Sequence, residues 1–128
     1  MHDEPTIVVR DVHAEETITA VNRFNDALNR HDLDSVMALM TDDCVLDTTW
    51  PPPDGQCITG QAAVRAYWEQ MLQSSPDAHF ATEELFATGD RCTVRWRYTF
   101  NGTQHIRGVD VLRVRDGKIA EKLAYVKG

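Results

Sequence analysis

The stretch from residue 91 to residue 126 restricts the fold more than any other part of the chain. Apolar and polar residues alternate from Cys92 to Phe100, a period of two that is typical of a strand with one buried face. Asn101-Gly102 and Asp116-Gly117 each separate one such run from the next. Both dipeptides tolerate the positive φ angles of tight hairpin turns. The sequence therefore predicts three antiparallel strands joined by two hairpins.

The middle strand of this stretch carries an acid in its apolar row. Asp110 shares its face of the strand with Ile106, Leu112 and Val114. Burying a carboxylate without a partner is strongly unfavourable, so Asp110 must be paired, protonated or functional. As a structural acid it would pair with the Lys122 ammonium or accept from the indole N–H of Trp96 or Trp68. As a functional group it would be an acid in a pocket.

The two turns decide which residues accompany Asp110 on the inner face. A three-residue loop with a glycine bulge at Asn101-Gly102 would keep the aromatic row of the preceding strand on that face. A strict two-residue turn at Asp116-Gly117 would point Ile119, Glu121, Leu123 and Tyr125 inward. One bulge would instead point Ala120, Lys122 and Ala124 inward. The sequence thus leaves open whether Glu121 or Lys122 faces the interior.

The N-terminal half predicts helices. Apolar residues recur at spacings of three and four over residues 14–30, 32–40 and 61–73, with Asp32 as the N-cap of the second helix. A short strand is expected over Cys44 to Thr49, then a stiff proline-rich loop over Trp50 to Gly55, and a less regular strand over Ala78 to Thr88. This order predicts an α+β fold. Residues 1–12 are expected to be a loose segment before one domain over residues 13–128.

Composition excludes several classes of function. The net charge of −7 argues against general nucleic-acid binding, which needs a basic surface. No apolar run approaches the roughly 20 residues that span a membrane. The 3 cysteines show no CxxC spacing, so reduced thiols and a cytoplasmic location are expected. The histidines show no metal-ligand spacing, and neither a metal nor a cofactor is expected.

Three segments carry a resemblance to a known family. They are RFNDALNRHDLDSVMALMTDD over residues 23–43, GQAAVR over residues 60–65 and GVDVLRVRDGKI over residues 108–119. With the element order, they resemble the nuclear transport factor 2-like superfamily, and within it the ketosteroid isomerase and SnoaL-like polyketide cyclase branch. The resemblance covers residues 14–126. It implies a cone-shaped, cystatin-like fold in which a curved antiparallel sheet wraps around three N-terminal helices, with an apolar pocket at the open end.

The resemblance also implies roles for single residues. Ketosteroid isomerases use a carboxylate base, a tyrosine donor and a protonated aspartic acid. Matching the motifs without gaps places the aspartic acid on Asp110, the tyrosine on Phe24, the base on Thr48 and a supporting tyrosine on Trp68. Phe24 has no hydroxyl and Thr48 is no base near neutral pH. Little or no isomerisation of a 3-oxo-Δ5 steroid is therefore expected.

The predicted site contains one catalytic residue, Asp110. The residues expected to bind the substrate are Phe24, Leu46, Thr48, Trp50, Trp68, Trp96 and Tyr98. Asn25 either binds a substrate carbonyl or lies half-exposed, and Asp47 is expected on the surface. The first hypothesis is an isomerase or cyclase that moves a proton next to the carbonyl of a small apolar molecule. The alternatives are a non-catalytic homodimeric binding module, and epoxide or water chemistry in which Asp110 acts with Lys122 or Glu121.

The outer face of the predicted sheet is cationic. Arg95, Arg97, Arg107, Arg113 and Arg115 surround Val109 and Val111 on that face. A cationic row on an acidic protein suits an anion or a partner protein, and the resemblance implies sheet-to-sheet homodimerisation. In such a dimer the two valines would form the centre of an isologous patch, and Glu83 or Glu84 would neutralise the arginines.

Overall fold

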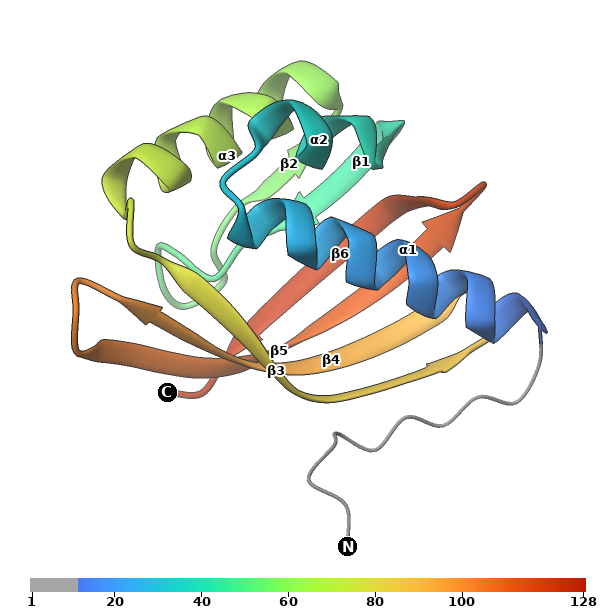
Figure 1. The fold of residues 1–128 in the computed structure, drawn as a ribbon. Coiled ribbons are helices and arrows are strands. Elements are labelled where there is room, and N and C mark those ends of the chain that lie inside the picture. The colour runs from blue at the N-terminus through green and yellow to red at the C-terminus, as the bar shows by residue number, and fades with distance from the viewer. Residues whose placement is uncertain (1–11) are drawn as a thin grey trace, which may run out of the picture.

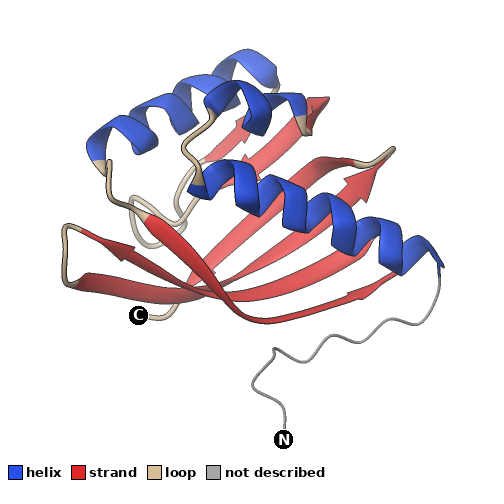
Figure 2. Ribbon diagram, viewed as in Figure 1, coloured by secondary structure: helices blue, strands red, loops and turns tan. Residues whose placement is uncertain are grey.

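The computed structural model describes residues 12–128. The predicted loose segment lies outside the described residues except for Val12, which begins the first helix. Within the described part, three helices lie on one side of a curved 6-stranded sheet, as Figures 1 and 2 show. In chain order the elements are α1 Val12–Asn29, α2 Leu33–Ala38, β1 Met40–Asp47, β2 Cys57–Thr59, α3 Gln61–Ser74, β3 His79–Thr88, β4 Arg91–Phe100, β5 Gln104–Arg115 and β6 Lys118–Val126. The predicted α+β class is confirmed.

The helices form where the apolar spacing predicts them. Helix α1 buries a stripe that includes Val21, Phe24 and Leu28, spaced three and four residues apart. The Asp32 carboxylate accepts a hydrogen bond from the Ser35 backbone N–H at 3.2 Å and so caps α2 as predicted. Helix α2 ends at Ala38, earlier than expected, because Met40 already pairs with β6 in the sheet.

The three predicted antiparallel strands and the less regular strand before them are present and form an antiparallel meander of β3, β4, β5 and β6. Phe100 pairs with Gln104 across a three-residue loop in which Asn101 and Gly102 have φ angles of 51° and 80°. The Asp77 carboxylate accepts hydrogen bonds from both of these backbone N–H groups, at 3.1 and 2.8 Å. Because the loop has three residues, the aromatic face of β4 lies on the same side of the sheet as Asp110, as the sequence predicts for a loop of this length.

The pairing of β6 with β5 decides whether Glu121 or Lys122 faces the interior. Arg115 pairs with Lys118 across a strict two-residue turn, but the register then shifts, so that Arg113 pairs with Glu121. Ala120 is the extra residue of this β-bulge, which reverses the side-chain parity along the strand. Ile119 and Lys122 are therefore both buried, whereas Glu121 is only half-buried. Each of the two predicted parities holds on one side of the bulge.

Strand order follows β2-β1-β6-β5-β4-β3, so β6 lies between β1 and the rest of the meander. Strand β1 runs parallel to β6, and Leu46 pairs with Lys122. Strand β1 begins four residues earlier than predicted, and β2 was not predicted, because its three residues show no alternation. The Trp50–Gly55 segment is a loop, as its prolines predict, with cis peptide bonds before Pro51 and Pro53.

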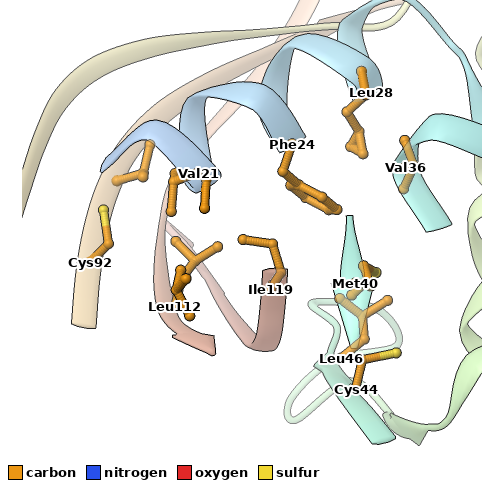
Figure 3. Close-up of a cluster of buried hydrophobic side chains, with 14 of the residues drawn as sticks. Val21, Phe24, Leu28, Val36, Met40, Cys44, Leu46, Cys92, Leu112 and Ile119 are labelled. Carbon is orange, nitrogen blue, oxygen red and sulfur yellow. The ribbon is translucent and has the colours of Figure 1, made fainter. Parts of the chain in front are cut away.

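The core lies between α1 and the concave face of the sheet. Figure 3 shows Val21, Phe24 and Leu28 of α1 facing side chains of β1, β5 and β6. Each such apolar side chain contributes roughly 1.5–3 kcal/mol when fully buried. No helix in residues 12–128 is long and apolar enough to cross a membrane.

Candidate functional site

An aromatic cavity of about 140 Å³ opens between α3 and the inner face of the sheet. Helix α3 contributes Tyr67, Trp68 and Met71, and β1 contributes residues 46 and 47. Thr48 and Thr49 follow β1, and the meander contributes the other lining residues: Phe80, Trp96, Tyr98, Ile106, Lys122 and Ala124. A larger groove of about 1020 Å³ lies beside the start of α1. Its lining is largely exposed and charged, so we place the candidate site in the aromatic cavity.

Lys122 is the one cation in the lining of this cavity. Its Nζ atom lies 3.2 Å from Oδ2 of Asp110, and the two side chains are only 7% and 6% exposed. Its ammonium also lies 5.5 Å from the centre of the Trp68 ring, within range of a cation–π contact. The ion-pair alternative for Asp110 is therefore the one that the structure shows. The bulge at Ala120 brings this pair together, because it turns Lys122 inward.

Three buried polar atoms near the pair have no hydrogen-bond partner among the described residues. They are Oδ1 of Asp110 and Nε1 of Trp68 and Trp96. Neither indole therefore donates to Asp110, which was the other structural alternative. An unsatisfied buried polar group costs about 1–3 kcal/mol, and native proteins keep few of them. Their concentration around one ion pair marks this region as a candidate site.

A second cavity lies behind the first. Its volume is about 10 Å³, and Asn25, Thr82 and Asp110 contribute to its lining. Phe80, Trp96 and Lys122 line both cavities and so separate them. The half-buried Asn25 thus lies near the ion pair, and Asp110 lies on the inner side of Lys122.

Five of the predicted substrate-binding residues line the aromatic cavity: Leu46, Thr48, Trp68, Trp96 and Tyr98. Phe24 is fully buried and packs edge-on against Trp68, with ring centres 6.1 Å apart. Trp50 is 73% exposed and lies outside the lining, because it begins the proline-rich loop that leaves β1. Asp47, expected on the surface, is half-buried and contributes to the lining.

The Thr48 hydroxyl is already used by the protein. It donates to the backbone oxygen of Trp50 at 3.0 Å and accepts from the backbone N–H of Gln56 at 2.9 Å. These bonds hold both ends of the proline-rich loop against β1. Thr48 therefore has a structural role at the rim of the cavity.

Sequence reasoning did not assign Tyr67 and Phe80 to the site. Tyr67 precedes Trp68 on the apolar side of α3, a signal that could have identified it. Burial raises the pKa of the Tyr67 phenol, and Tyr98 and Asp110 raise it further. Tyr67 therefore remains a neutral hydrogen-bond donor at neutral pH. Within residues 12–128, no three His, Cys, Asp or Glu side chains gather as a metal site.

Comparison with solved structures supports the fold. An NTF2-like protein of unknown function from Mesorhizobium loti is 38% identical, with a TM-score of 0.83, over 96% of this chain and 99% of that protein. A proposed ketosteroid isomerase from Kribbella flavida is 23% identical, with a TM-score of 0.76, over 90% of this chain and 80% of that protein. A computationally designed 17-OHP binder is 26% identical, with a TM-score of 0.75, over 88% of this chain and 91% of that protein.

A search of curated proteins gives no match. The SnoaL-like domain family, in contrast, matches residues 21–122. This range begins within α1 and ends at Lys122, so it contains most of the core, all of the cavity lining except Ala124, and both members of the buried ion pair. The chain therefore belongs to the SnoaL-like domain family and has the NTF2-like fold.

Proposed function

We propose that this protein binds a small apolar molecule with a carbonyl group and moves a proton next to that carbonyl. The observation that carries the proposal is the buried Lys122–Asp110 ion pair at the wall of an aromatic cavity. An ammonium in a water-poor site stabilises the negative oxygen that forms when a proton leaves the neighbouring carbon. Lys122 is the donor to this oxygen. It takes the role that sequence matching had given to Asp110.

Asp110 is the proposed proton acceptor. Its Oδ1 atom has no hydrogen-bond partner among the described residues, so its lone pairs are available. Asp110 lies on the inner side of Lys122. The proton therefore reaches Asp110 either through the Lys122–Asp110 contact or after a small shift of the side chains that separate the two cavities. Asp47 also contributes to the cavity lining and is the competing acceptor, which variants can distinguish.

The size of the cavity limits the ligand. An engineered protein cavity of roughly 150 Å³ holds benzene, and the aromatic cavity measures about 140 Å³. Pockets for larger ligands measure roughly 300–1,000 Å³. We therefore expect a ligand with one ring, such as a cyclic or aryl ketone. This size, together with Phe24 and Thr48 at two of the isomerase positions, argues against steroid turnover.

Binding and proton transfer can be measured separately. Trp68 and Trp96 line the cavity, so Trp50→Phe removes the exposed tryptophan and leaves fluorescence that reports on the site. We expect cyclohexanone or acetophenone to change this fluorescence. In D₂O, NMR should show the protein accelerating deuterium uptake at the carbon next to the carbonyl.

Matched variants test the roles of the ion pair. Lys122→Met and Asp110→Asn should abolish the accelerated exchange, whereas Lys118→Met should keep it because Lys118 is exposed. Loss of exchange in Asp47→Asn with retention in Asp110→Asn would move the acceptor role to Asp47. Absence of both fluorescence change and exchange would overturn the proposal.

The second candidate function is binding without catalysis. Phe24 and Thr48 support it because they remove two groups of the isomerase mechanism, and a designed protein with this fold binds 17-OHP. Ketone binding without deuterium uptake in the unmodified protein would favour this candidate.

We also propose that the protein forms a homodimer through the outer face of the sheet. Tyr125 is 57% exposed there, and it pairs with the half-buried Val109. Glu83 neutralises Arg107 within the chain, at 2.9 Å, which reduces charge repulsion between two such faces. Val109→Glu together with Val111→Glu should convert the dimer to a monomer in sedimentation velocity. A monomer in the unmodified protein would contradict the proposal.

A further inference from the structure

We propose that Lys122 forms a covalent imine with a small aldehyde that enters the aromatic cavity. The inference rests on the proposed function insofar as the aldehyde occupies the same cavity as the ketone. All three lysines of the chain, Lys118, Lys122 and Lys127, lie in the described part, and only Lys122 is buried. Lysines that react with carbonyl compounds are typically desolvated in apolar pockets.

The surroundings of Lys122 meet the geometric needs of this reaction. Its side chain lines the cavity, and the Trp68 ring lies 5.5 Å from Nζ on one side. The other aromatic side chains of the lining, including Phe80 and Tyr98, enclose a volume of about 140 Å³, enough for one ring. An aryl aldehyde in this space has its carbonyl group as its only polar part, and the Lys122 ammonium attracts the carbonyl oxygen. The carbonyl carbon then lies next to Nζ.

The amine must lose a proton before it can attack. A charged pair becomes less favourable as water leaves its surroundings, because neither ion is solvated. The two side chains are already only 7% and 6% exposed, and an apolar ligand that fills the cavity removes this remaining exposure. One proton then passes from Nζ to Oδ2 of Asp110 across the 3.2 Å contact, which leaves a neutral amine beside a neutral carboxylic acid.

The remaining steps need no further reactant. The Nζ lone pair attacks the carbonyl carbon, and one nitrogen-bound proton moves to the oxygen to give a carbinolamine. Asp110 then returns its proton to the hydroxyl group, the carbon–oxygen bond breaks and water leaves. The products are a protonated imine and one water, so the ammonium and the aldehyde are fully accounted for. The imine cation faces the Asp110 carboxylate, and the ion pair is restored.

The inner cavity provides a place for the released water. Its volume of about 10 Å³ is close to the smallest cavity that holds one water molecule. Asn25, Thr82 and Asp110 supply polar groups to its lining, and Lys122 separates it from the aromatic cavity. Water that leaves the carbinolamine carbon, which is bonded to Nζ, therefore has a polar site close by, on the other side of Lys122. Asn25→Leu should fill this site and slow imine formation.

Reductive trapping tests the proposal. The folded protein is incubated with benzaldehyde and sodium cyanoborohydride, which reduces an imine to a stable secondary amine. Intact-mass and peptide mass spectrometry then locate the benzyl group. Among the lysines, we expect a benzyl group on Lys122 alone in the unmodified protein and in Lys118→Arg, and loss of this label in Lys122→Arg; the peptide map separates this label from any on the α-amino group. Protein unfolded in urea should be labelled at all three lysines without preference.

The outcomes separate this proposal from the proposed function. Labelling of exposed Lys118 and Lys127 in preference to Lys122 would overturn the imine proposal. If acetophenone still changes the fluorescence of the Trp50→Phe variant in that case, the cavity binds ketones and the proposed function stands. If neither acetophenone nor benzaldehyde binds, both proposals fail. Because the label is mapped on the unmodified protein, the result does not depend on the folding of a variant.

Discussion

Replacing Asp110 by asparagine should destabilise the fold, although the two side chains have nearly the same shape. The change leaves the Lys122 ammonium buried without its counter-ion. Both side chains are at most 7% exposed, so water cannot take over from the carboxylate. Removing one partner of a buried pair costs about 3–5 kcal/mol, a large fraction of the roughly 5–15 kcal/mol by which a domain is stable.

Removing both charges should have the opposite outcome. Asp110→Leu combined with Lys122→Met leaves no buried ion in residues 12–128. Replacing such a pair by apolar residues of similar volume is often neutral or stabilising by about 1–4 kcal/mol. The double variant should therefore be at least as stable as the unmodified protein, and its site should be inactive. An exposed pair gives the control: Asp26→Asn removes a partner of Arg30 where the side chains are 69% and 54% exposed, and should change little.

Urea unfolding followed by far-UV circular dichroism measures these differences. With a slope of roughly 2 kcal/mol per molar urea, a loss of about 4 kcal/mol lowers the midpoint by about 2 M. The double variant should recover this shift. If Asp110→Asn unfolds at the same urea concentration as the unmodified protein, Asp110 is protonated and the ion-pair reasoning is refuted.

Three further predictions concern other parts of the molecule. Gly108→Ala should destabilise the protein by about 1–3 kcal/mol, because the new Cβ would lie 2.3 Å from a backbone oxygen of β6 and 2.6 Å from the Trp96 ring. Thermal unfolding measures this loss, and an unchanged melting temperature would contradict the prediction. The Gly102 N–H holds the pKa of Asp77 below 3.8, so the hairpin contact is fully stabilising above that pH and is lost as the pH falls through the lower folded-state pKa. An NMR pH titration of the Gly102 amide should show this step, and Asp77→Ala should remove it. Ellman's reagent should label the exposed Cys57 rapidly and the other two cysteines only on unfolding, because burial raises the pKa of both buried thiols; rapid reaction of more than one thiol would be inconsistent with this burial.

The sequence predicted the elements whose signals are local. Apolar spacing located the helices, and Asn101-Gly102 with Asp116-Gly117 located the hairpins, because these signals depend on near neighbours in the chain. Strand β2 was not predictable in this way. It is three residues long, and its pairing with Val45 in β1 requires the intervening proline-rich loop to fold back.

The candidate site was only partly predictable, for a related reason. Asp110 stood out because an acid in an apolar row needs an explanation. Its partner depended on the bulge at Ala120, and no local signal in the sequence distinguishes a bulge there from regular pairing. The position of Trp50 was not predictable from its neighbours in the sequence either, because it depends on the direction in which the loop leaves β1.

The place of β6 in the sheet has a consequence for biosynthesis. This strand joins β1 to β5, yet the ribosome synthesises it after all the other strands of the domain. Until it emerges, β1 with β2 and β3 with β4 and β5 are separate fragments, each with an unpaired edge. Contacts between residues far apart in sequence also form slowly. We expect the nascent chain to depend on protection from aggregation until residues 118–126 have left the exit tunnel, and the Lys122–Asp110 pair to form in that final step.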